Sequence, residues 1–211
     1  KLEDVEDFNK EEKLEHELFS LGFYLTNHPL EKFRTLLRKL DIGFIGESKT
    51  IKTAGVILNA RMRTSERGRF VILMLSDPHN VSEIAFYNNE IIEEKRNLFS
   101  PGTFVIVDLE ASENTTRLAG KDISEFTERI TSVMKRLVLT GCADSQTAAM
   151  ELSSVLKGGG RTKIMLELLL EKHKVSILLP GAYSITPQAV CEISNLSWIK
   201  GIEIDTNSLL I

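Results

Sequence analysis

The residues best suited to chemistry are basic and lie in one stretch of the chain. Residues 49–75 carry six cations and one acid, a net charge of +5, namely Lys49, Lys52, Arg61, Arg63, Arg67 and Arg69 against Glu66. The whole chain has a net charge of −4. A local positive stripe still attracts phosphates, because salt screens charges that lie more than ~8–10 Å away. The sequence therefore predicts an anion-binding surface here.

No arrangement of residues in the sequence predicts catalysis. The histidines have no metal-ligand spacing, and they are His16, His28, His79 and His173. Cys142 and Cys191 have no neighbouring His or Lys that would activate a thiolate. The glycines 158–160 precede Arg161-Thr162 and lack phosphate-loop spacing, so we expect a flexible loop. We predict no catalytic residue, metal site or cofactor in this chain, and a capping or packing role for His28.

Composition narrows the class of protein. The 211 residues are 42% hydrophobic and 27% charged, as in ordinary globular domains. The apolar runs are far shorter than the ~20 residues that cross a bilayer, and the acidic start does not resemble a secretory leader. Two cysteines fit a reducing compartment. We expect a cytoplasmic protein with no membrane partner. Because the chain starts at Lys1, we also expect a piece of a longer polypeptide.

Residues 1–48 are predicted to form a short helical segment. Asn9 followed by Glu12 resembles a capping box. Leucines then recur at helical spacing, at Leu14, Leu18, Leu21 and Leu25. Asn27-His28-Pro29 breaks this helix, and Pro29 suits the first position of the next one.

Residues 49–124 have the period of strands. The pattern predicts strands at about 49–64, 69–75, 81–87 and 103–111 and one reaching 123, with a helix at 90–98. A helix between strands three and four is typical of the OB-fold barrel. Ala54 and Val56 begin the inward phase of strand one, and Arg61 and Arg63 share the outward face. In the other strands, Phe70 and Phe86 follow the inward phase, and Tyr87 points outward as a platform for stacked bases.

Residues 125–211 are predicted to form an α+β domain in the order β-α-β-β-α-β, a ferredoxin-like arrangement. The overall fold class is therefore α+β, with a helical segment, an OB barrel and this last domain. Near the end, Trp198, Ile199 and Ile202 form either a terminal core strand or a patch for a partner, because large aromatic residues occur in both settings.

Two stretches resemble a known family. Residues 17–30, E-L-F-S-L-G-F-Y-L-T-N-H-P-L, look like a signature of the α subunit of bacterial DNA polymerase III, and residues 178–187, L-L-P-G-A-Y-S-I-T-P, resemble that family's final motif. The resemblance implies a non-catalytic C-terminal region of a DNA-directed DNA polymerase. The polymerase carboxylates, their Mg²⁺ and the sliding-clamp peptide would lie upstream. The OB domain would contact single-stranded template DNA, and the last domain would bind the clamp-loader tau subunit.

The resulting expectations are specific. Template contact would fall to Arg61, Arg63, Arg67, Arg69 and Tyr87, and tau docking to Trp198, Ile199 and Ile202. The acidic Glu66 in the first hairpin departs from the family's DNA-binding pattern. Two alternatives stay open: a free-standing OB module that binds tRNA or other RNA, and a structural connector whose arginines only solvate the edge of a barrel.

Overall fold

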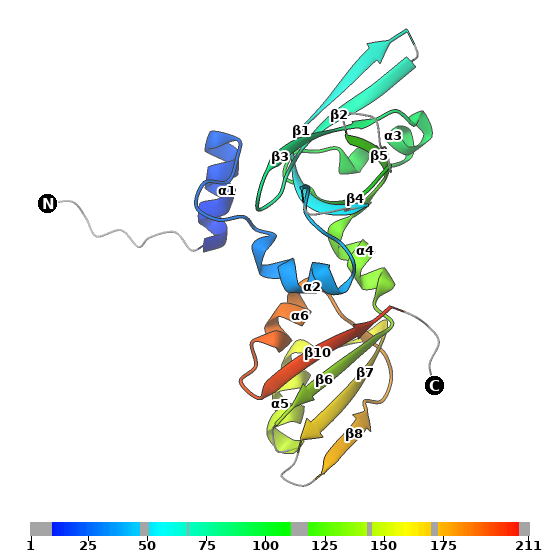
Figure 1. The fold of residues 1–211 in the computed structure, drawn as a ribbon. Helices are drawn as coiled ribbons and strands as arrows, with labels where there is room; N and C mark the ends of the chain where they lie inside the picture. Colours follow the sequence, from blue (N-terminus) through cyan, green and yellow to red (C-terminus); the bar gives the residue numbers. More distant parts are fainter. Residues whose placement is uncertain are drawn as a thin grey trace, which may run out of the picture. The chain divides into compact units, whose positions relative to one another are not determined.

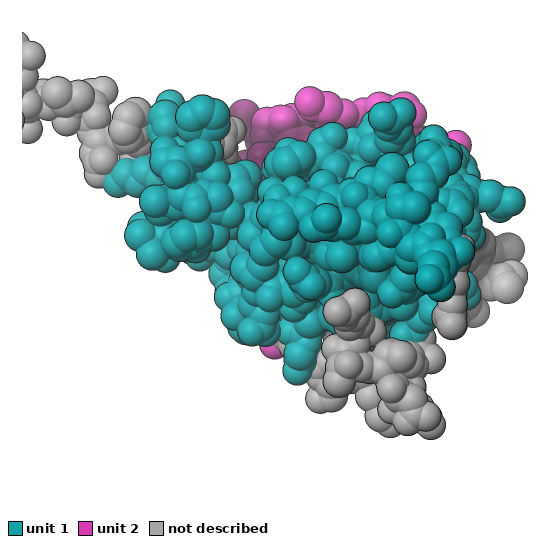
Figure 2. Space-filling view, turned by 90° about the horizontal axis from the view of Figure 1, so that it is seen from above, with its two compact units in different colours: residues 1–34, 42–125 teal, residues 35–41, 126–211 magenta. Residues whose placement is uncertain are grey.

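The computed structural model describes residues 10–46, 51–66, 68–110, 118–142, 145–169 and 173–206. The chain divides into two compact units (Figure 2). Unit 1 comprises Lys1–Arg34 and Ile42–Glu125, and unit 2 comprises Thr35–Asp41 and Phe126–Ile211. In the part of the chain that the model describes, no helix is long and apolar enough to span a membrane.

The helical segment contributes to both units. It contains α1 (Lys10–Leu21), a 3-10 turn (Glu31–Phe33) and α2 (Arg34–Lys39). Gly22 ends α1 with a positive φ of 78°, and its N–H donates to the Leu18 carbonyl at 3.0 Å. Asn9 of the predicted capping box lies outside the described residues. The second helical stretch begins at Glu31, two residues after Pro29.

Unit 1 contains a closed barrel in the strand order β1-β2-β3-β5-β4 (Figure 1). Its strands are β1 (Lys52–Ser65), β2 (Gly68–Ser76), β3 (Val81–Phe86), β4 (Phe104–Leu109) and β5 (Leu118–Glu125). Between β3 and β4 lie α3 (Asn89–Glu94) and a 3-10 turn (Arg96–Leu98). A five-stranded barrel with its helix at this place is an OB fold. The predicted fold class is confirmed.

A β-bulge changes which side chains of β1 face the core, whereas β2 alternates regularly. The register of β1 against β2 shifts between Ile57 and Asn59, and Ile57 is buried while Leu58 is half-buried. On β2 the buried residues are Val71, Leu73 and Leu75. The predicted inward phase of Phe70 is therefore wrong. Both faces of β2 are apolar, so alternation alone does not select the buried face.

Beyond the barrel, β1 and β2 continue as a two-stranded arm (Figure 1). Pairing of β2 with β3 begins only at Val71, whereas pairing of β1 with β2 reaches Ser65 and Gly68. Residues 61–66 of the arm are exposed. Arg61, Arg63 and Arg69 therefore lie where the barrel passes into this arm.

Unit 2 is a sheet in the order β10-β6-β7-β8, with β9 paired to the start of β7. Its elements are α4 (Phe126–Val133), β6 (Arg136–Gly141), α5 (Ser145–Val155), β7 (Lys157–Leu169), β8 (Lys174–Leu178), β9 (Tyr183–Ser184), α6 (Pro187–Ser194) and β10 (Ile199–Asp205). The predicted succession of strands and helices is present. One detail differs: β6 and β7 pair directly in parallel, whereas a ferredoxin-like sheet inserts a strand between them.

The triple glycine is not the predicted loop, because it opens β7. Gly158 and Thr162 both pair with Tyr183 of β9, so the residues between them form a bulge. A Cβ on Gly160 would lie 2.1 Å from the Tyr183 carbonyl oxygen. Glycine is therefore required here by a close approach of two backbones.

Candidate nucleic-acid interface

The outer face of β1, β2 and β3 brings two of the predicted arginines together. Arg61 pairs with Ile72 and Arg63 pairs with Phe70 across the strands, and directly paired residues share one face of a sheet. A shallow depression on this face is lined by both arginines and by Asn59, Ile72, Met74 and Glu83. The face therefore offers cations around an apolar floor, with one acid at its side.

An aromatic pair lies on the same face. The rings of Phe70 and Tyr87 stack with centroids 5.6 Å apart and planes inclined by 30°. Tyr87 is 57% exposed and Phe70 is half-buried. Sequence reasoning placed Tyr87 correctly and missed Phe70. The signal for it was the alternative alternation Val71, Leu73, Leu75, which leaves Phe70 outside the core.

Arg69 is not part of this face. Arg69 pairs with Thr64, one residue out of phase with the Arg63–Phe70 pair, so its side chain starts from the opposite face of the arm. Arg67 lies outside the described residues. The structure thus assembles Arg61, Arg63 and Tyr87 from the predicted set and adds Phe70.

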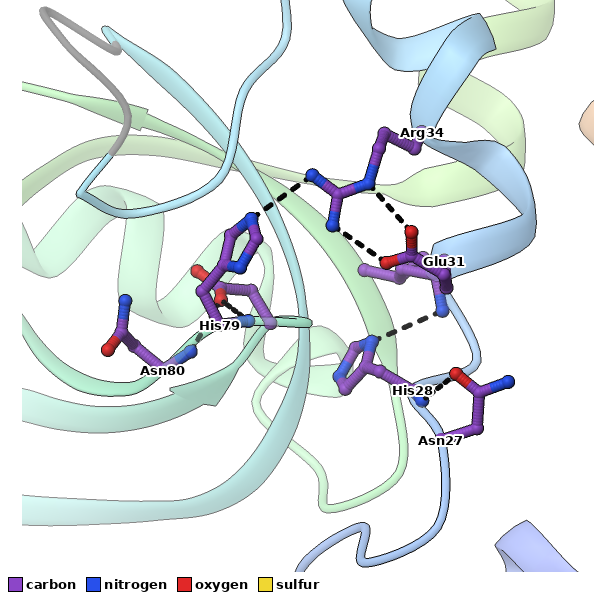
Figure 3. Close-up of polar contacts among 8 residues, drawn as sticks. Asn27, His28, Glu31, Arg34, His79 and Asn80 are labelled. Atoms are coloured by element: carbon purple, nitrogen blue, oxygen red, sulfur yellow. Dashed lines mark hydrogen bonds and ion pairs between the residues drawn. The ribbon is translucent and has the colours of Figure 1, made fainter.

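A buried carboxylate holds the turn between β2 and β3, and Asn27 and His28 of the motif at residues 17–30 are drawn with this turn in Figure 3. Asp77 is buried in that turn, where its Oδ1 accepts the backbone N–H groups of His79 and Asn80 at 2.7 and 2.8 Å. Its Oδ2 accepts the N–H of Ile45 at 2.8 Å. One carboxylate therefore fixes the turn and joins it to the segment that enters β1.

Arg34 contacts the same turn from the helical segment. Its guanidinium forms a bidentate pair with Glu31, at 2.8 Å to Oε1 and 2.7 Å to Oε2. A third nitrogen, Nη1, lies 3.1 Å from Nε2 of His79, and the group lies over the Phe44 ring at 5.1 Å (Figure 3). These contacts position the second and third strands relative to the helical segment.

His28 is the buried histidine of the helical segment. Its Nδ1 accepts the N–H of Leu30 at 3.2 Å, and its burial fits the packing role of the predicted capping or packing alternatives. The ring is 8% exposed and meets the Tyr24 ring edge-on at 5.0 Å. Nε2 has no hydrogen-bond partner among the described residues. Burial lowers the pKa of His28 to about 4, against the opposing effect of the Asp77 charge, so the ring is neutral at pH 7.

The predicted partner patch near the end of the chain is mostly core. Trp198 is 6% and Ile202 8% exposed, and Ile199 is half-buried. The indole N–H of Trp198 donates to Glu151 of α5 at 2.7 Å. A Cβ on Gly141 would lie 2.5 Å from the Trp198 carbonyl oxygen. Of the two alternatives, a role in the core describes Trp198, directly before β10, and Ile202 within it.

Within the described ranges, no group of three or more His, Cys, Asp or Glu residues lies close enough to hold a metal ion. What the outer face of β1–β3 provides is chemistry for binding. Its arginines supply hydrogen-bond donors and charge for phosphates, and its stacked rings supply a flat apolar surface for bases.

Comparison with known proteins identifies relatives of one kind. No family model matches the chain. Curated relatives named DNA polymerase III subunit alpha include those of Rickettsia felis, 29% identical over 59% of this chain, and Caulobacter vibrioides, 26% identical over 88% of it. The Pseudomonas aeruginosa protein of the same name is 26% identical over 82% of the chain. The chain spans 11%, 17% and 14% of these three relatives.

Among solved structures, the second OB-fold domain of replication protein A from Methanococcus maripaludis is 10% identical, with a TM-score of 0.26, and the match covers 36% of this chain and 81% of that one. The fold assignment therefore depends on the strand order of the barrel itself.

Fold and site together define a two-unit chain with an OB barrel whose outer face carries arginines and stacked aromatic rings. The relatives confirm the resemblance that the motifs at residues 17–30 and 178–187 predicted. This chain is similar to part of the α subunit of bacterial DNA polymerase III.

Proposed function

We propose that the chain is a C-terminal, non-catalytic part of a replicative DNA polymerase α subunit, and that its barrel contacts single-stranded template DNA. One observation carries the proposal: Arg61, Arg63, Phe70 and Tyr87 share the outer face of β1–β3. Cations that follow a phosphate backbone beside aromatic rings that stack bases are the usual components of single-strand binding. The names of the relatives make DNA the favoured nucleic acid.

The rest of the predicted assembly belongs to the same proposal. The polymerase activity, its Mg²⁺ and the contact with the sliding clamp would belong to upstream parts of a longer chain, and the complex would work in the cytoplasm. The tau subunit of the clamp loader would dock on unit 2. Because Trp198 and Ile202 are buried, we assign them to support of that surface and not to direct contact.

The test of template contact is a titration of the 211-residue chain with fluorescent oligo-dT. The variant Arg61→Gln/Arg63→Gln should lower the affinity about 25-fold at ~0.1 M salt, since each phosphate contact to a single strand contributes about 0.7 to the slope of log K against log salt. The matched control is Arg96→Gln/Lys121→Gln, which removes the same charge from exposed positions of unit 1.

Equal binding by the two double variants would remove the DNA-contact role from this face. A titration with an RNA oligonucleotide of the corresponding sequence distinguishes template contact from the alternative of an RNA-binding OB module, because contacts to the 2′-hydroxyl favour RNA. Clearly tighter binding of RNA than of DNA would replace template contact with RNA binding.

A further inference from the structure

A second group of cations surrounds the glycine-rich start of β7. Lys157, Arg161 and Lys163 are exposed, and residues 156–166 contain no acid. Arg136 of β6 is the direct neighbour of Lys163 in the parallel register. Four positive side chains therefore lie at one end of the second sheet.

The strand partners of these cations on β7 include no acid among the described residues. Like charges directly opposite each other on neighbouring strands destabilise a sheet. The strand partners of residues 157–163 in the described structure are Arg136, Tyr183 and Ser184, and none of them is acidic. Arg136 faces Asp205 on its other side, and the nearest acid along β7, Glu167, pairs with Lys174 at 2.8 Å. Lys163 donates to the Gly181 carbonyl at 3.0 Å, which is a neutral acceptor. A concentration of positive charge of this kind attracts an anionic ligand.

The backbone between Lys157 and Arg161 carries no side chains, because residues 158–160 are glycines. No atom lies within 4 Å of the place where a Cβ would stand on Gly158 or on Gly159, and Gly159 has a φ of 85°. An extended chain of phosphates can therefore approach the strand closely between Lys157 and Arg161. The described residues 157–163 include no exposed large hydrophobic side chain. Exposed apolar side chains occur on the neighbouring strand β8, such as Leu178, which pairs with Met165, and not among the cations themselves. Phosphate contacts require only charge and close approach, and residues 157–163 offer both.

We propose that Lys157, Arg161 and Lys163 bind the phosphodiester backbone of a nucleic acid, so that unit 2 has a nucleic-acid contact of its own. The contact is independent of sequence and of base type, because no exposed aromatic pair accompanies these cations. It does not depend on the interface proposed for unit 1, since it uses other residues in the other unit.

The experiment uses the 211-residue chain and a long fluorescent oligo-dT. Arg161→Gln/Lys163→Gln should weaken binding about 25-fold at ~0.1 M salt and reduce the salt slope by about 1.4. The control Lys121→Gln/Lys200→Gln removes the same charge at exposed positions on β5 and β10 and should leave both quantities nearly unchanged. Arg161→Lys keeps the charge and should retain the slope, which separates loss of a contact from loss of folding.

The same variant is also made in the Arg61→Gln/Arg63→Gln background. Loss of the residual binding there supports the second contact even if unit 1 does not bind DNA. Equal affinity and slope for the Arg161→Gln/Lys163→Gln variant and its control would overturn the proposal. So would unchanged oligo-dT binding together with loss of binding to poly-glutamate, because that result would assign the cations to an acidic protein.

Discussion

The aromatic residues of the two units have opposite surroundings. On the barrel, Phe70 and Tyr87 stack on an open face beside Arg63, with Tyr87 57% exposed. In unit 2, Trp198 lies directly before β10, is 6% exposed and is hydrogen-bonded to Glu151. Both units place aromatic rings beside a sheet, but only the rings on the barrel are accessible to a ligand.

The difference follows from what covers each sheet. The barrel closes on itself, so its core is internal and the outer side of β1–β3 remains open (Figure 1). The sheet of unit 2 is open and needs α5 and α6 to bury one face, and Trp198 lies on that covered side. An aromatic residue is therefore accessible to a ligand where no further layer covers it, whatever its position in a strand.

The largest expected effect is on the buried ring. Trp198→Ala should lower the free energy of unfolding of unit 2 by about 3–5 kcal/mol, because it leaves a cavity and removes the donor to Glu151. Urea denaturation followed by circular dichroism measures this loss. Trp198→Phe is the control that keeps most of the packing and should cost clearly less. Unchanged stability together with a specific loss of tau binding would show that Trp198 serves a partner directly.

The second prediction concerns His28, the buried imidazole of unit 1, and the dependence of stability on pH. The folded pKa of His28, about 4, lies below the usual 6.5, so the unfolded state binds more protons between these values. Stability should therefore fall as the pH is lowered from about 6.5 to about 4, by up to about 3 kcal/mol. Stability measured against pH should become flatter in His28→Gln and remain unchanged in His173→Gln, whose side chain is exposed. A slope that His28→Gln leaves intact would place the titrating group elsewhere.

The sequence predicted the barrel well because its information is local. Apolar alternation, Gly68 at the hairpin and the break near Pro101 define the strands and the helix between them. The phase of β2 was not predictable in this way. Ile72 and Met74 are as apolar as Val71 and Leu73, and closure of the barrel decides that Val71 and Leu73 are the buried set.

Long-range pairing limited the prediction in unit 2. Direct pairing of β6 with β7 depends on where the α5 crossover returns, which no local pattern states. The glycines at 158–160 have the composition of a loop, and their place in β7 follows from contact with Tyr183 far along the chain. The candidate site was predicted for Arg61, Arg63 and Tyr87, which local alternation places, and missed for Phe70, which pairing places.

The smallest expected effect on stability is at the stacked pair of Phe70 and Tyr87 on the barrel. Phe70→Leu keeps an apolar side chain against the barrel but removes the flat ring, so stability should change little while the affinity for oligo-dT falls about 5- to 100-fold, as expected for a lost base stack of about 1–3 kcal/mol. The salt slope should stay constant, because no cation is lost. Phe19→Leu is the matched control, since Phe19 is 92% exposed and belongs to α1, which is not part of the barrel. If Phe70→Leu and Phe19→Leu bind oligo-dT alike, the ring pair supports the barrel surface only, and the two units do not differ in the way that their aromatic residues suggest.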